Sequence, residues 1–225
     1  MNHTLSSRLI YLLRGLAPYM ILGLLVAAVS NITLFSYMQN NIYQTKYFDK
    51  HWIRRVQDLT WLGPYFRISS MIGNTPVILL ITVPMMRHLY ARNNFHTSMT
   101  FAILLSSSFI VSFTLKHMFN RERPVNDGFG EHNLTTSFPS GHSIAVPFIF
   151  FLVQWFLIKK YSKKALLLVP VLLWQTFFTV ISRVYLSTHY PTDIVGGLLA
   201  SACFLSVFYL GLKRNKEFFE NEKYE

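Results

Sequence analysis

Six apolar runs separated by polar gaps dominate the chain. A helix that crosses a bilayer needs about 20 mostly apolar residues, and the runs approach or reach that length. Their bounds are Leu16–Phe35, Met71–Met86, Thr97–Phe119, Ser143–Ile158, Ala165–Tyr185 and Ile194–Leu212. The pattern predicts an all-α integral membrane protein, a bundle of six transmembrane helices in which residues 1–225 form a single membrane-embedded domain. The first run exceeds the core of a signal peptide, so we expect it to stay uncleaved.

Composition favours a membrane protein over a soluble one. Hydrophobic residues make up 52% of the chain and charged residues 14%, against roughly 25% charged residues in ordinary soluble domains. In a soluble protein the net charge of +11 would suggest nucleic acid. Here the basic residues fall mostly between the apolar runs, as they do at the flanks of membrane helices. We expect the bilayer and a lipid as partners, and no nucleic acid.

The distribution of basic residues also predicts an orientation. With six crossings both termini share one side, and that side carries 12 of the 21 Lys and Arg residues. Because positive flanks mark the cytoplasmic side, we expect both termini in the cytoplasm. The third-to-fourth and fifth-to-sixth connections then face the periplasm or the cell exterior. Short loops and compact size suggest a bacterial inner membrane.

Two outer segments leave alternatives open. The segment from Tyr37 to Ser70 mixes aromatic and basic residues, which is typical either of an amphipathic segment lying at the membrane interface or of a loop with anchoring aromatics. The segment from Asn126 to Phe138 is polar and is either a lid or a plain connection. Both segments, with the gaps between helices, are candidates for selecting the lipid.

Three polar stretches stand at the ends of predicted helices. They are Lys116 to Pro124, Pro139 to His142, and Ser182 to Asp193. In a six-helix chain the two connections that carry them lie on the same face of the membrane. Three cationic side chains, two histidines and a carboxylate can therefore converge there. Ionisable groups at such depth are costly and usually functional.

The cations and one helix start are suited to a phosphate group. Lys116, Arg123 and Arg183 supply three positive charges, and the arginine fork bonds two phosphate oxygens at once. Ser140 and Gly141 stand where the fourth helix begins. Its free N–H groups and positive dipole end favour an anion, and glycine lets the backbone approach closely. The residues predict a phosphate pocket built without a metal.

The two histidines can divide the removal of a phosphate. One attacks phosphorus, and the other protonates the leaving oxygen and later activates water. Asp193 lies four residues after His189 and is spaced to hold its second ring nitrogen, which predicts His189 as nucleophile and His142 as acid and base. These residue types also bind zinc. Three nearby cations oppose a metal ion and no His-Glu-x-x-His pattern exists, so we predict no metal and no cofactor.

The ordered pattern resembles the three-part signature of the type 2 phosphatidic acid phosphatase superfamily: Lys, six residues, Arg-Pro; Pro-Ser-Gly-His; Ser-Arg, five residues, His, three residues, Asp. It matches without a gap between Lys116 and Asp193, and the six-helix layout extends the resemblance to the whole chain. The resemblance implies a metal-independent phosphatase with a helical core and the residue roles just given. Arg121 lies outside the signature, and a surface position or a substrate contact both remain open for it.

The leading functional hypothesis is a membrane lipid phosphatase acting on a lipid phosphate or diphosphate. Phosphatidylglycerophosphate, phosphatidic acid, undecaprenyl diphosphate and the phosphates of lipid A all remain candidate substrates. The alternative is a lipid phosphotransferase that uses the same phosphohistidine. Intact motifs disfavour a non-catalytic protein. The six apolar runs disfavour the soluble vanadium haloperoxidases of the superfamily.

Overall fold

The computed structural model describes residues 5–92, 95–124 and 136–214, and these parts are helical apart from short connections. The helices are α1 (Leu5–Asn40), α2 (Ile42–Gln57), α3 (Gly63–Ile72), α4 (Thr75–Ala91), α5 (Phe95–Met118), α6 (Gly141–Tyr161), α7 (Val169–Tyr185) and α8 (Pro191–Arg214), with 3-10 turns at Thr60–Leu62 and Ser162–Leu168. Residues 125–135 lie outside the described part, so the choice between lid and connection there stays a prediction.

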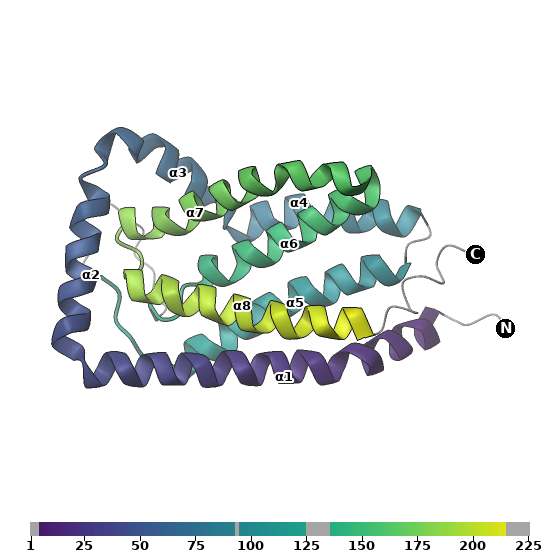
Figure 1. Ribbon diagram of the computed structural model, residues 1–225, viewed down its shortest axis with the longest axis horizontal. Coiled ribbons are helices and arrows are strands. Elements are labelled where there is room, and N and C mark those ends of the chain that lie inside the picture. The colour runs from purple at the N-terminus through teal and green to yellow at the C-terminus, as the bar shows by residue number, and fades with distance from the viewer. Residues whose placement is uncertain (1–4, 93–94, 125–135, 215–225) are drawn as a thin grey trace.

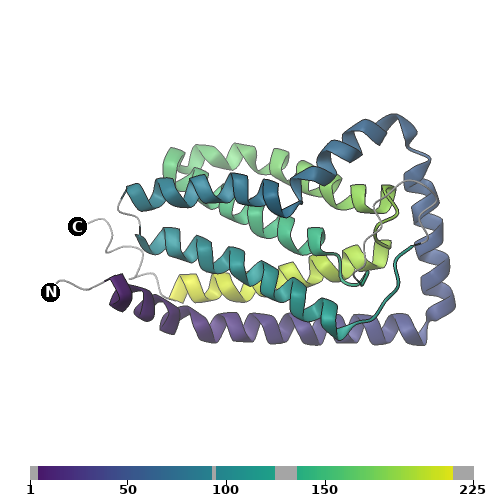
Figure 2. The same cartoon turned by 180° about the vertical axis from the view of Figure 1, so that it is seen from behind.

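The helices form an elongated bundle (Figure 1). The long helices α1, α5, α6, α7 and α8 run along it, and α1 packs along α8. The start of α1 and the end of α8 lie at one end, and α2 crosses the other end (Figures 1 and 2). Among the described residues five helices are long and apolar enough to cross a membrane, and α3 with α4 makes a sixth candidate. The predicted all-α membrane bundle is confirmed.

The second predicted span differs from the structure. The run from Met71 to Met86 was expected to be one helix, but the chain breaks at Gly73 and Asn74, and α3 and α4 meet at a bend of 56°. Asn74 is extended with ψ 140°, and Pro76 stands in the first turn of α4, where its fixed φ suits a helix start. A Cβ at Gly73 would overlap the His142 ring. The break between α3 and α4 therefore lies against His142, a residue distant in sequence.

The segment from Tyr37 to Ser70 is helical and not an ordinary loop. Helix α2 lies across the end of the bundle (Figure 1). Its buried positions are Thr45 and Asp49, whereas Tyr43 and Tyr47 are exposed. This geometry favours the amphipathic alternative, in which the helix rests at the interface.

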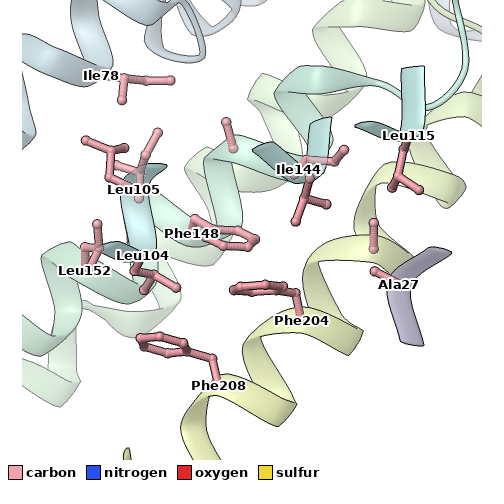
Figure 3. Close-up of a cluster of buried hydrophobic side chains, with 14 of the residues drawn as sticks. Ala27, Ile78, Leu104, Leu105, Leu115, Ile144, Phe148, Leu152, Phe204 and Phe208 are labelled. Carbon is pink, nitrogen blue, oxygen red and sulfur yellow. The ribbon is translucent and has the colours of Figure 1, made fainter. Parts of the chain in front are cut away.

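The core aligns the helices that carry the predicted site. Phe148 of α6 stacks on Phe204 of α8 with ring centroids 5.3 Å apart (Figure 3). Nearer the site, a Cβ at Gly197 would lie 2.6 Å from the Ser140 carbonyl oxygen and 2.6 Å from Ser143 Cβ. Glycine at this position therefore lets the first turns of α8 and α6 touch.

Candidate active site

The structure brings the predicted site residues together at the end of the bundle crossed by α2. Lys116 stands in the last turn of α5 and Arg183 in the last turn of α7. Ser140 directly precedes α6, Gly141 and His142 begin it, and Asp193 stands in the first turn of α8. Lys116 lies close enough to interact electrostatically with Arg123, Arg183 and Asp193. His142 likewise lies near Arg183 and His189. The expected convergence of the two connections is thus observed, while the role of each residue stays a prediction.

Each of the three cations is oriented by an oxygen acceptor. Lys116 Nζ donates to the Thr136 carbonyl oxygen at 2.8 Å, and Arg123 Nη1 donates to the Thr188 carbonyl oxygen at 2.7 Å. Arg183 is 7% exposed, and its Nη1 donates to Ser70 Oγ at 2.5 Å. Burial lowers the pKa of Arg123, although Asp193 acts in the opposite direction. An arginine stays protonated despite such a shift, so a positive cluster is held in place before any anion arrives.

The start of α6 differs in detail from the expected anion site. The Ser140 backbone N–H donates to the Asp193 carbonyl oxygen at 3.0 Å, so this amide is not available to a phosphate. The Ser140 hydroxyl oxygen is buried and has no hydrogen-bond partner among the described residues. Buried polar atoms are normally paired, so a bound phosphate is a suitable partner. At Gly141 a Cβ would lie 3.7 Å from Lys116 Cε, so α6 starts against the lysine.

His189 is 3% exposed, and its Nδ1 lies 3.5 Å from Asp193 Oδ2. That separation is longer than an ordinary hydrogen bond. Burial lowers the pKa of His189 to about 4, although Asp193 favours the protonated ring. Its backbone N–H donates to the Arg183 carbonyl oxygen at 3.2 Å. The neutral imidazole needed for nucleophilic attack is therefore the favoured form.

Asp193 is completely buried and is held by more groups than the sequence indicated. Arg121 Nη1 donates to its Oδ1 at 2.5 Å. The Ser137 hydroxyl and the Tyr190 backbone N–H both donate to its Oδ2. Both oxygens of the Asp193 carboxylate are therefore held by hydrogen bonds, including Oδ2, which faces His189.

Arg121 lies between two buried carboxylates and not on the open surface. Its Nη2 donates to Asp49 Oδ2 at 2.6 Å, so it bridges Asp49 and Asp193. Asp49 is 1% exposed, and burial raises its pKa against the opposing effect of Arg121. Sequence reasoning missed Asp49, whose only local signal is a single acid in a helix rich in basic residues.

His142 contacts the end of the segment from Tyr37 to Ser70. Its Nε2 lies 3.2 Å from the Ser70 carbonyl oxygen, and Gly73 leaves room for its ring. A carbonyl accepts only, so Nε2 carries a proton here and Nδ1 remains to exchange one. Nothing local in the sequence marked Ser70 as a neighbour of either His142 or Arg183.

The arrangement combines an anion pocket, a neutral buried imidazole with a carboxylate behind it, and a second imidazole with a fixed tautomer. Among the described residues, no group of three or more His, Cys, Asp or Glu side chains is arranged to hold a metal ion. Such a set can carry out acyl-type or phosphoryl transfer through a histidine, and the cations select the phosphoryl group.

Comparisons with known proteins extend this description. A family model described as the PAP2 superfamily matches residues 95–217. An Escherichia coli K12 protein named "Putative undecaprenyl-diphosphatase YbjG" is 36% identical over 104 residues, covering 44% of this chain and 48% of that protein. Phosphatidylglycerophosphatase B of Bacillus subtilis 168 is 25% identical over 145 residues, covering 61% of this chain and 68% of that protein. The first match thus spans about half the length of that relative.

Two crystal structures share the fold. A transmembrane PAP2-type phosphatidylglycerolphosphate phosphatase from Bacillus subtilis superposes with a TM-score of 0.71 and 22% identity, covering 86% of this chain and 96% of that one. Aquifex aeolicus LpxE superposes with a TM-score of 0.52 and 20% identity, covering 72% and 94%.

Proposed function

The chain belongs to the PAP2 superfamily, and on that basis we propose that it is a membrane lipid phosphatase working through a phosphohistidine at His189. The observation that carries the proposal is the buried His189 ring, which lies beside Asp193 and within electrostatic reach of Lys116 and Arg123. An attack on phosphorus needs a neutral nucleophile beside positive charge, and these residues provide both.

In the first step Lys116, Arg123 and Arg183 bind the phosphate oxygens. His189 Nε2 attacks phosphorus while its Nδ1 proton faces Asp193, so the positive charge that develops on the ring is stabilised. The bond from phosphorus to the lipid oxygen breaks. The negative charge of the bound phosphate favours a second proton on His142, at Nδ1. His142 gives this proton to the lipid oxygen, which leaves as an alcohol or, from a diphosphate, as a lipid monophosphate.

In the second step water replaces the lipid. His142 is now neutral, and its Nδ1 takes a proton from the water as the oxygen attacks phosphorus. The phosphorus–nitrogen bond breaks, and its electron pair returns to His189. Inorganic phosphate leaves, and both histidines recover their starting protonation states. The Ser70 carbonyl accepts the Nε2 proton of His142 in both steps and so keeps the exchanging nitrogen the same.

The substrate class is a lipid with a terminal phosphate or diphosphate. The names of two relatives support undecaprenyl diphosphate and phosphatidylglycerophosphate, while phosphatidic acid and lipid A phosphates remain in the proposed set. The short loops and compact size support a bacterial inner membrane, and the charge pattern supports an orientation with both termini in the cytoplasm and the site facing the periplasm. Either lipid would then reach the site from the outer leaflet of that membrane.

Phosphate release from a panel of these lipids tests the proposal. Protein purified in detergent is assayed with EDTA present, beside His189→Ala and the matched control His117→Ala, which alters an exposed histidine at the end of α5. Release by the wild type and His117→Ala, with none from His189→Ala, supports the phosphohistidine. Undiminished release by His189→Ala contradicts it. Phosphate transfer to an added alcohol without release would support the phosphotransferase alternative instead.

A further inference from the structure

A single arginine outside the family signature connects two buried carboxylates. Arg121 Nη1 lies 2.5 Å from Asp193 Oδ1, and its Nη2 lies 2.6 Å from Asp49 Oδ2. The exposed fraction of the side chain is 15% for Arg121, 1% for Asp49 and 0% for Asp193. Pairs this well buried depend strongly on both partners, because removing one leaves an uncompensated charge.

Asp49 belongs to α2, far from Asp193 in the chain, and it contacts the start of α8 directly. The Thr192 backbone N–H donates to Asp49 Oδ1 at 3.1 Å, and the Thr192 hydroxyl donates to Oδ2 at 2.8 Å. Arg121 Nη1 also donates to the Thr192 hydroxyl oxygen at 2.7 Å. Helix α2 is thus joined to the turn of α8 that carries Asp193, and α2 lies outside the family-matched range 95–217.

The geometry points to Arg121 and Asp49 as positioning residues that hold Asp193 against His189, a role that rests on the proposed function. Arg121 holds Oδ1 of Asp193, which leaves Oδ2 turned toward the His189 ring. Without Arg121, the carboxylate loses its restraint on Oδ1. Asp49 and Asp193 would also be left as neighbouring buried acids, and like charges favour protonation of one of them. A protonated or rotated Asp193 orients His189 poorly.

Arg121 is not placed to bind the substrate phosphate. Its two terminal nitrogens are directed at Asp193, Asp49 and the Thr192 hydroxyl, and its guanidinium carbon lies 4.2 Å from the centre of the Tyr190 ring. This planar, bidentate and stacked arrangement is specific to arginine. Its loss is therefore expected to affect the chemical step and not the binding of phosphate.

Steady-state kinetics, phosphoenzyme trapping with ³²P-labelled lipid, and inhibition by vanadate as a phosphate mimic test the inference. For Arg121→Gln we expect kcat to fall about 10- to 100-fold, the usual effect of misplacing a catalytic group. KM and vanadate inhibition should stay within about twofold, because the phosphate-binding cations remain oriented. Arg121→Lys should recover only part of kcat, since a point charge does not reproduce the fork.

Three further variants make the result specific. Asp49→Asn keeps the side-chain shape, and we expect a smaller fall in kcat at constant KM. It also tests the inference should Arg121→Gln fail to fold. Lys50→Gln alters an exposed neighbour on α2 and should match the wild type. Arg123→Gln, at a proposed phosphate ligand, should instead raise KM and weaken vanadate inhibition.

Wild-type kcat in either Arg121→Gln or Asp49→Asn, each folded as judged by size-exclusion chromatography, overturns the inference. So does a loss of vanadate affinity in Arg121→Gln as large as that in Arg123→Gln, because Arg121 would then be a phosphate ligand. An active wild type beside an unaffected Arg121→Gln leaves the proposed function standing. A wild type that neither releases phosphate nor forms a phosphoenzyme removes the proposed function and this inference with it.

Discussion

His189 Nδ1 and Asp193 Oδ2 lie 3.5 Å apart, so the carboxylate faces the imidazole without a close hydrogen bond. Catalytic hydrogen bonds often tighten only when substrate is bound. In the proposed mechanism the ring of His189 becomes positive as it attacks phosphorus, which strengthens the attraction to Asp193. Asp193 should therefore stabilise the His189 ring most strongly in the transition state.

Asp193→Asn should lower kcat by about 10²- to 10⁴-fold while leaving measurable activity, because the group orients the nucleophile and does not attack. Phosphate-release kinetics provide the measurement. Asp58→Asn, at the exposed acid that directly follows α2, is the matched control and should leave kcat unchanged. Full activity in Asp193→Asn would show that its contact with His189 has no catalytic role.

Acid should destabilise the folded protein through His189. Its pKa is about 4 when folded, against an ordinary value of 6.5, so between those values the unfolded chain binds a proton that the folded chain does not. Stability from this group is fully present above pH 6.5 and is lost as pH falls to about 4. The loss is about 3 kcal/mol as an order of magnitude.

The thermal midpoint in detergent, followed from pH 7 to pH 4, isolates that effect when wild type is compared with His189→Gln. Other groups titrate in both proteins and cancel in the difference. The wild type should lose stability more steeply in this window. Parallel curves for the two proteins would mean that burial does not hold His189 neutral.

Gly73→Ala should impair His142, because the added methyl group would occupy the space of its ring. A displacement of the ring by about 1 Å is expected to lower kcat about 10- to 100-fold. Met71→Ala, an exposed position two residues earlier, controls for disturbance of α3. Activity assays of both variants, with size-exclusion chromatography, separate a displaced His142 ring from a misfolded protein. Equal activity of the two variants would exclude the proposed crowding of His142.

The sequence predicted the features that depend on local pattern. Apolar runs located the long helices, because bilayer thickness sets their length. The motif spacing placed Lys116, His142 and Asp193 at helix ends, and the structure brings them together. The break at Gly73 was missed although Gly73, Asn74 and Pro76 are typical of a helix boundary, because the apolar residues on both sides were joined into one span.

Pairings between distant segments were beyond the reach of periodicity. Asp49 and Arg121 are 72 positions apart, and so are Ser70 and His142. Each looks ordinary within its own segment, since an acid on a basic helix or a serine in the last turn of a helix has many uses. Only the packing of α2 and α3 over the bundle end shows which partners they meet.

The backbone hydrogen bond from Ser140 N–H to the Asp193 carbonyl oxygen has a kinetic consequence. It joins the first turns of α6 and α8 through main-chain atoms, so the segment carrying His142 and the segment supporting His189 form one stiff unit. That unit is assembled before a lipid arrives, so reorganisation contributes little to the barrier. If the proposed function holds, we expect the entry of the lipid or the departure of its dephosphorylated product to limit turnover.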